Sequence, residues 1–208
     1  IDLAAGTPDT LLRSLMVRGI PIVSASARAK RFSGMAVLID RNLAGFSAAR
    51  DLLLLGHERL GVIGDYDTSV LEAVKLAITR YAPNAGVIDA DVEHAPALVE
   101  QGVTAFACEG VVNARKLAEV LRSKGIKTPD GCSIMAIGAT SDRPEFTGYY
   151  VSESDEVTAI AETIKDYQPH RPAVVWLSGK YMNAGTTAAV RGEIKSSPPL
   201  RARMVASA

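Results

Sequence analysis

Polar side chains that can hold a small molecule follow several short apolar runs of this sequence. Carboxylate and hydroxyl groups exchange hydrogen bonds with the hydroxyls of a sugar or nucleoside, and a tyrosine ring can also stack on a ring face. Ligands bind outside the carboxyl ends of strands in open α/β sheets. The candidate ligand-binding residues at such positions are therefore Ser24, Asp65, Tyr66, Asp67, Glu109 and Glu153.

Simpler interpretations compete with a ligand role at two of these places. Residues 65–69 are rich in turn-forming types, so a solvated turn would explain them. Glu109 precedes Gly110 and would also serve as the cap of a helix that begins at Val111. Farther along, Asp89–His94 carries three carboxylates that lie on one side of an extended chain. An exposed strand edge explains that segment without a cation, so we predict no metal site.

The sequence lacks the patterns that usually mark an enzyme. It contains no Gly-x-Ser-x-Gly, no Walker loop and no His-Glu-x-x-His, and Gly-Val-Ile-Gly-Asp does not complete a dinucleotide fingerprint. Its only cysteines, Cys108 and Cys132, form neither a disulfide framework nor a zinc spacing. We therefore predict no enzymatic activity and no cofactor, and a reducing, cytoplasmic compartment.

Composition describes an ordinary globular chain of 208 residues, with 48% hydrophobic and 22% charged residues. Lys plus Arg and Asp plus Glu each total 23, so the net charge of zero gives no reason to expect this segment itself to bind nucleic acid. No apolar run approaches the roughly 20 residues of a membrane span, so we predict no membrane partner.

Strand and helix patterns alternate along the chain, which predicts parallel sheets covered on both faces. Gly56 fits the left-handed position after a helix, where His57 would interact with the last carbonyls. In the last helix, Val157, Ile160, Ala161 and Ile164 are expected to face inward, and the final twenty residues read as an irregular tail. The expected strands are Pro21–Val23, Met35–Ile39, Leu60–Ile63, Val87–Ile88, Thr104–Cys108, Ser133–Ile137, Tyr149–Val151 and Val174–Leu177. Two helices are expected to start near Thr10 and at Asn42. Four more are expected at Val70–Tyr81, Ala95–Glu100, Val111–Lys124 and Asp155–Tyr167.

Three blocks of the sequence resemble the effector-binding domain of LacI-type bacterial transcription regulators. They are MAVLIDRNLAGFSAARDLLLLGHERLGVIG, VTAFACEGVVNARKLAEVLRSKGIKTPDGCSIMAIG and YYVSESDEVTAIAETI. The first contains a strand ending in Asp, a helix with Ala-Gly, and Gly-His-x-Arg before an apolar strand. The three blocks follow one another in the order and at the separations typical of the family, and the resemblance covers roughly Ile1 to Thr187.

This resemblance implies an α/β fold of two Rossmann-like parallel-sheet lobes, the periplasmic-binding-protein-like fold of type I, with a small effector bound in the cleft between the lobes. Residues 1–39 and 152–176 would form an incomplete N-terminal lobe, and residues 40–151 and 177–208 the C-terminal lobe. It further implies a homodimer. The helix-turn-helix that binds operator DNA, and the first part of the N-terminal lobe, would precede Ile1.

The sequence departs from the family at three positions that usually bind sugar. The family's Asn-Asp pair is Glu109-Gly110 here, its later Asp falls near Gly138-Ala139, and its helix Arg is replaced within Val70–Ala73. The cleft would then take a sugar, a different metabolite, or none. The main functional prediction is the sensor of a regulator. The alternative is the solute-binding protein of a sugar ABC transporter, and an α/β enzyme is less well supported.

Overall fold

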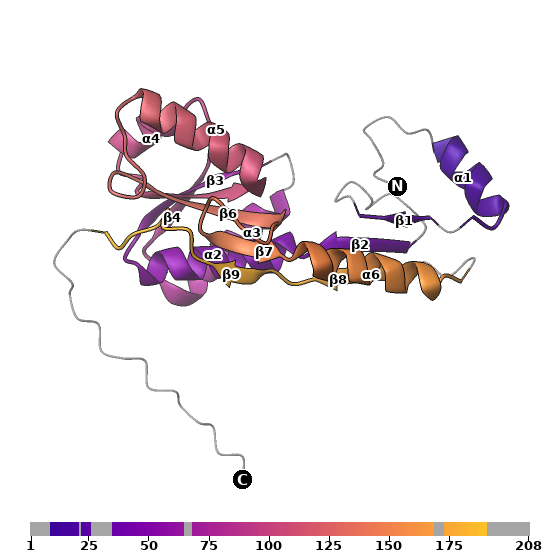
Figure 1. Ribbon diagram of the computed structural model, residues 1–208. Coiled ribbons are helices and arrows are strands. Elements are labelled where there is room, and N and C mark those ends of the chain that lie inside the picture. Colours follow the sequence, from indigo (N-terminus) through magenta and orange to yellow (C-terminus); the bar gives the residue numbers. More distant parts are fainter. Residues whose placement is uncertain (1–8, 21, 26–34, 65–67, 169–172, 191–208) are drawn as a thin grey trace, which may run out of the picture.

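The computed structural model describes residues 9–20, 22–25, 35–64, 68–168 and 173–190, and it arranges their strands in two separate sheets (Figure 1). The smaller, sheet A, has the strand order β1-β2-β8 and is entirely parallel. The larger, sheet B, has the order β4-β3-β5-β6-β7-β9. Its strands are parallel except for β9, which runs antiparallel to β7. The alternating pattern thus correctly predicts parallel sheets, to which one antiparallel edge strand is added.

Sheet A is small and has helix α6 on one face. Its apolar cluster combines Val23, Met35 and Val37 of the sheet with Ala159 and Ile160 of the helix. The elements of this part are α1 (Asp9–Val17), β1 (Val23–Ser24), β2 (Met35–Ile39), α6 (Glu153–Lys165) and β8 (Ala173–Leu177).

Sheet B is covered by helices on both faces. Side chains alternate along each strand, so Met135 and Ile137 pack with α2 and α3, whereas Ile134 and Ala136 pack with α5 on the opposite face. The strands are β3 (Arg59–Ile63), β4 (Gly86–Asp89), β5 (Ala105–Glu109), β6 (Ser133–Thr140), β7 (Gly148–Val151) and β9 (Lys180–Met182). The helices are α2 (Arg41–Leu54), α3 (Thr68–Tyr81), α4 (Ala95–Glu100) and α5 (Gly110–Ser123).

The chain crosses between the two sheets at three short junctions. β2 of sheet A continues through Asp40 into α2, β7 of sheet B continues through Ser152 into α6, and β8 of sheet A continues through residues 178–179 into β9. Each junction leaves the carboxyl end of a parallel strand and enters the other half of the molecule. The carboxyl edges of both sheets therefore face each other (Figure 1).

Local capping fixes the helices at these junctions. Asp40 accepts a hydrogen bond from the Leu43 amide at 2.9 Å and begins α2. Ser152 accepts one from the Asp155 amide at 3.1 Å and begins α6. Gly56 ends α2 with a φ of 88°, and the amide of His57 reaches back to the Leu52 carbonyl. This is the glycine-terminated helix end that the sequence predicts.

The segment that follows β9 lies along the amino edge of sheet B and was not predicted from the sequence. The Thr147 hydroxyl accepts hydrogen bonds from the amides of Ala184 and Thr186, and Thr186 Oγ1 donates to the Ile134 carbonyl at 2.7 Å. The Ala188 amide donates to Ser133 Oγ at 3.0 Å. Residues 183–190, called the C-terminal strap below, thus join the starts of several strands.

Helix α6 corrects one sequence prediction. Val157, Ala161 and Ile164 are exposed rather than inward-facing, and the one residue of α6 that is buried is Thr163. Thr163 donates to the Ala159 carbonyl within the helix, so its hydroxyl can be buried at little cost. The face toward sheet A is therefore the one with Ala159, Ile160 and Thr163.

Candidate functional site

The candidate site lies at the facing carboxyl edges of the two sheets. From sheet B it includes the ends of β3, β5 and β6, and from sheet A the end of β1. Three of the predicted residues, Asp65, Tyr66 and Asp67, follow β3 and lie outside the described residues. The structure places the other three, Ser24, Glu109 and Glu153, and adds neighbours that sequence reasoning missed.

Glu109 is the last residue of β5 and is only 5% exposed. Its carboxylate lies against the backbone of Gly64, so close that a Cβ on Gly64 would come within 2.7 Å of Glu109 Oε2. Glu109 also occupies the position before helix α5, but its side chain makes no capping hydrogen bond there. The capping interpretation of this carboxylate is therefore wrong, and the side chain is held instead at the edge of the sheet.

Arg41 is a residue that sequence reasoning missed. It begins α2 directly after the β2 junction, and its side chain crosses Gly138 at the end of β6. Gly138 has a φ of 69°, and a Cβ there would lie 2.7 Å from Arg41 Cγ. Only glycine therefore suits this position. The same rule that selected other strand-end residues would have selected Arg41, because it lies two residues beyond the end of β2.

Thr140 and Glu156 form a polar contact between the two halves of the chain. Thr140, at the end of β6, donates from Oγ1 to Glu156 Oε2 at 2.7 Å, and Glu156 lies in the first turn of α6. Local patterns do not reveal this pair, because the residues come from different elements. The predicted Glu153 lies in the same turn but is exposed, so Glu156 is the better-placed carboxylate of this helix end.

Ser24 is the second and last residue of β1 and is fully buried. It pairs in register with Ala36 of β2, which places its hydroxyl at the carboxyl edge of sheet A. Sheet A thus contributes a small neutral hydrogen-bonding group. Sheet B and the helix starts contribute Glu109, Arg41 and Glu156, which accept or donate charge-assisted hydrogen bonds.

In the segment Asp89–His94, strand β4 ends at Asp89 and the chain then turns toward α4, so the interpretation of this segment as a strand edge is wrong beyond Asp89. Asp91 accepts hydrogen bonds from the amide of His94 at 2.8 Å and from its Nδ1 at 2.7 Å. Those bonds lower the pKa of Asp91, and the carboxylate in turn raises the pKa of His94. Within the described ranges, no group of three or more His, Cys, Asp and Glu side chains is arranged to hold a metal ion.

His57 is buried and joins the C-terminal strap to sheet B. Its Nε2 lies 3.0 Å from the Ala188 carbonyl and its Nδ1 2.9 Å from Thr104 Oγ1. The carbonyl can only accept, so Nε2 carries the proton and Nδ1 accepts from the Thr104 hydroxyl. Burial lowers the pKa of His57, an effect that the bond to Ala188 partly offsets. The side chain therefore fastens the strap. Both ring nitrogens are used there, so the prediction that the imidazole interacts with the last carbonyls of α2 is wrong, and only the backbone amide of His57 makes such a bond.

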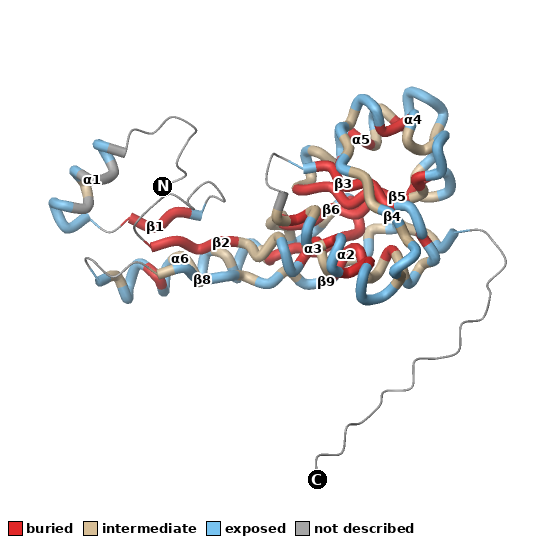
Figure 2. The backbone as a smooth tube through the Cα atoms, turned by 180° about the vertical axis from the view of Figure 1, so that it is seen from behind, coloured by how far each residue is buried: buried red, intermediate tan, exposed pale blue. Residues whose placement is uncertain are grey.

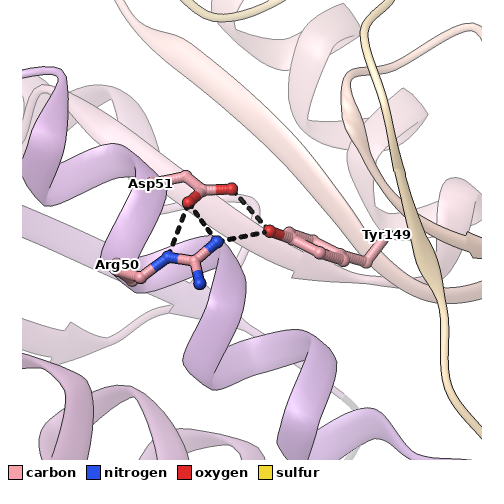
Figure 3. Close-up of polar contacts among 3 residues, drawn as sticks. All are labelled: Arg50, Asp51 and Tyr149. Atoms are coloured by element: carbon pink, nitrogen blue, oxygen red, sulfur yellow. Dashed lines mark hydrogen bonds and ion pairs between the residues drawn. The ribbon is translucent and has the colours of Figure 1, made fainter.

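A second polar cluster fastens α2 to the β7–β9 edge of sheet B (Figure 3). Tyr149 donates to Asp51 Oδ2 at 2.5 Å, and Arg50 binds Oδ1 of the same carboxylate through Nε at 2.9 Å and Nη2 at 2.7 Å. Burial and the Asp51 carboxylate raise the pKa of Tyr149. The ring of Tyr149 meets Tyr181 of β9 edge-on at 5.8 Å between centroids. The cluster lies away from the carboxyl edge and has a structural role.

An open hollow of about 690 Å³ lies beside the end of α5, lined by Arg115, Arg122, Lys127 and Phe146 among others. It is formed by residues that precede β6 and β7, and hence lies near the amino edge of sheet B. Arg115 is paired with Glu145 at its rim. This hollow is therefore separate from the candidate site.

Several solved structures share the fold. A LacI family transcriptional regulator from Enterococcus faecium with bound ribose is 16% identical, with a TM-score of 0.68 over 89% of this chain and 77% of its own. One from Enterococcus faecalis, also with ribose, is 18% identical, with a TM-score of 0.68 over 92% and 77%. One from Weissella paramesenteroides with bound sucrose is 14% identical, with a TM-score of 0.67 over 88% and 75%. No family model and no curated protein sequence matches.

These likenesses confirm the fold class and the structural resemblance that the three sequence blocks predict. The chain has the two-sheet fold of these LacI family structures over most of its length. The three structures named above are of transcriptional regulators. Among the described residues, no helix combines the length and apolarity needed to cross a bilayer. The lobe boundaries and the ligand roles of individual residues stay predictions.

Proposed function

We propose that this chain is the effector-sensing domain of a LacI-type transcriptional regulator, and that it binds a small polyhydroxylated metabolite between the carboxyl edges of its two sheets. The observation that carries the proposal is the buried carboxylate of Glu109 at the end of β5, in a fold whose solved examples include regulators with bound ribose and sucrose. A buried carboxylate at a strand end is suited to accept hydrogen bonds from vicinal hydroxyls.

The polar groups at the site divide the ligand contacts between the two halves of the molecule. Glu109 and Glu156 accept, Arg41 donates, and Ser24 does both. A ligand that bridges these groups would favour a closed arrangement of the sheets over an open one, because only the closed form makes all the contacts. Binding would then shift the populations of the two forms by the difference in their affinities.

The regulator model includes three further elements. The domain would act as a homodimer with two-fold symmetry, which would match a palindromic operator. A helix-turn-helix outside this chain would bind the operator, since a neutral domain has no electrostatic basis for doing so. Two buried thiols, Cys108 and Cys132, suit a reducing cytoplasmic compartment.

A thermal-shift screen of ribose, glucose, sucrose, nucleosides and sugar phosphates tests the proposal. A ligand that binds only the folded state at about 100 times its Kd adds roughly 2.7 kcal/mol. For a domain of this size, that raises the melting temperature by about 5 °C or more. We expect at least one compound of the panel to give such a shift, and a flat response across the panel would contradict the proposal.

Two variants locate the binding. Glu109→Gln keeps the shape of the side chain but loses the charge, so the hit should bind at least about tenfold more weakly, in line with the roughly 1.5–3 kcal/mol of a hydrogen bond to a charged group. Glu119→Gln removes an exposed carboxylate on α5 and should leave binding unchanged. Equal affinities of the two variants would place the ligand elsewhere.

A further inference from the structure

Among the described residues, the sheet A half and the sheet B half of the molecule share no hydrophobic core. Each apolar cluster of that part of the chain lies within one half, either between sheet A and α6 or on one face of sheet B. No described helix or strand of one half packs extensively against an element of the other. Figure 2 shows β8 and α6 mostly in tan and pale blue, so the sheet A half is also thinly covered. The angle between the halves therefore depends on a few polar contacts.

The three junctions between the halves lie together. The Asp40 amide donates to the Leu177 carbonyl at 2.9 Å, which joins the first junction to the third. Gly179, in the third junction, lies so close to β7 that a Cβ on it would come within 3.1 Å of the Tyr150 amide nitrogen. Because the covalent links are gathered in one place, the halves can rotate about a common pivot unless side chains restrain them.

Two side-chain contacts cross this pivot, and both end on the first turn of α6. Thr140 Oγ1, at the end of β6, donates to Glu156 Oε2 at 2.7 Å. Lys180 Nζ, at the start of β9, lies 3.1 Å from Asp155 Oδ2. Strands β6 and β9 pair with β7 on its two sides, and β7 leads directly into α6 through the Ser152 cap. The first turn of α6 is therefore held from both sides of β7.

We propose that the first turn of α6 is a two-point lock that fixes the angle between the two halves. Because Thr140 and Lys180 lie on opposite sides of β7, a rotation of α6 toward one of them lengthens the contact with the other. The bond from Thr140 is half-buried and ends on a carboxylate, so it is the stronger restraint. The side chains of Lys180 and Asp155 are 78% and 51% exposed, so their ion pair is weaker and is screened by salt.

The lock would regulate the candidate site, a consequence that rests on the proposed function. An effector that contacts both sheets binds one relative arrangement of them, so its apparent affinity falls with the fraction of molecules outside that arrangement. The lock itself belongs to the chain alone. It is therefore tested without any effector, and its failure and the failure of the proposed function remain distinguishable.

Double electron–electron resonance on the whole chain measures the distance between the halves. Spin labels are attached at Glu119→Cys on α5 and Glu162→Cys on α6, two exposed positions that lie in different halves. The native thiols of Cys108 and Cys132 are buried, so they do not take up label in the folded protein. We expect the doubly labelled protein to give a narrow distance distribution.

Two substitutions in this labelled protein each release one point of the lock. Thr140→Val should raise the ratio of displaced to locked molecules at least about tenfold, and Lys180→Met about two- to fivefold. The matched controls lie on α3. Thr79→Val removes a hydroxyl that bonds within its own helix, and Lys75→Met breaks an exposed ion pair with Glu72. Neither control should change the distribution.

Salt separates the two points of the lock. Added NaCl should broaden the distribution of Thr140→Val further, because its remaining restraint is the exposed ion pair, and should leave Lys180→Met unchanged. Circular dichroism checks that each variant is folded. If Thr140→Val is not, Glu156→Ala removes the same hydrogen bond from the α6 side. A folded variant of either contact whose distribution is as narrow as that of the controls would overturn the two-point lock.

Discussion

Replacing His57 by alanine tests how the C-terminal strap is fastened to sheet B. The substitution removes two hydrogen bonds, one to the Ala188 carbonyl and one from the Thr104 hydroxyl. Both partner groups are only partly buried and can bind water, so each bond contributes about 1 kcal/mol rather than a full desolvation penalty. We therefore expect His57→Ala to lower the free energy of unfolding by about 2 kcal/mol at pH 7.5.

Urea unfolding followed by circular dichroism measures this loss. His57→Gln should lose only about half as much, because its amide can still donate to the Ala188 carbonyl. His94→Ala is the control, since it removes an exposed imidazole paired with Asp91 at the surface, and should have far less effect. A His57→Ala variant as stable as the unsubstituted protein would refute the role of this side chain in fastening the C-terminal strap.

The structure determines whether the stability of the folded protein rises or falls with pH. Unfolded His57 takes up a proton near pH 6.5, whereas burial lowers the pKa of folded His57. Between these two pKa values the unfolded state binds more protons, so stability falls as the pH drops below about 6.5. His94 acts in the opposite sense, because Asp91 raises its pKa. The comparison is therefore made in the His94→Ala background, where adding His57→Ala should remove this loss of stability at low pH.

Three further substitutions test other contacts by the same unfolding assay. Tyr149→Phe removes the hydroxyl that donates to Asp51 and should cost about 1.5–3 kcal/mol, and a loss below about 0.5 would refute its role. Gly138→Ala should cost about 1–2 kcal/mol for the left-handed backbone alone, and more because the new Cβ meets Arg41. Thr147→Val keeps the shape but removes the hydroxyl that binds the strap, and should cost about 2 kcal/mol; no loss would show that Ala184 does not need this anchor.

Features that depend on neighbouring residues could be predicted from the sequence. Gly56 ends α2 as expected, and Ser24 and Glu109 lie at the carboxyl ends of their strands, because helix ends and strand ends are encoded in short local patterns. The turn between Asp91 and His94 also joins residues only three positions apart, although the sequence predicts an exposed strand edge there. Such contacts involve short loops of chain, which their own residue types specify.

Features that depend on distant segments could not be predicted in this way. The strap binds Ser133 and His57 through Ala188, at sequence separations that no periodicity reveals. Strand β9 is only three residues long, and it forms because Tyr181 pairs with Tyr149 at the sheet edge. The predicted inward face of α6 was wrong for a related reason. Its apolar positions allowed two faces, and packing against sheet A selected one of them.

The central claim is that one small molecule contacts the carboxyl edges of both sheets at once. Isothermal titration of the best ligand into the unsubstituted protein, Ser24→Ala and Glu109→Gln tests it most directly, since these residues belong to sheet A and sheet B respectively. We expect saturable binding with one site per chain, weakened by each substitution. Binding that neither substitution alters, in variants that remain folded, would contradict a site between the two sheets.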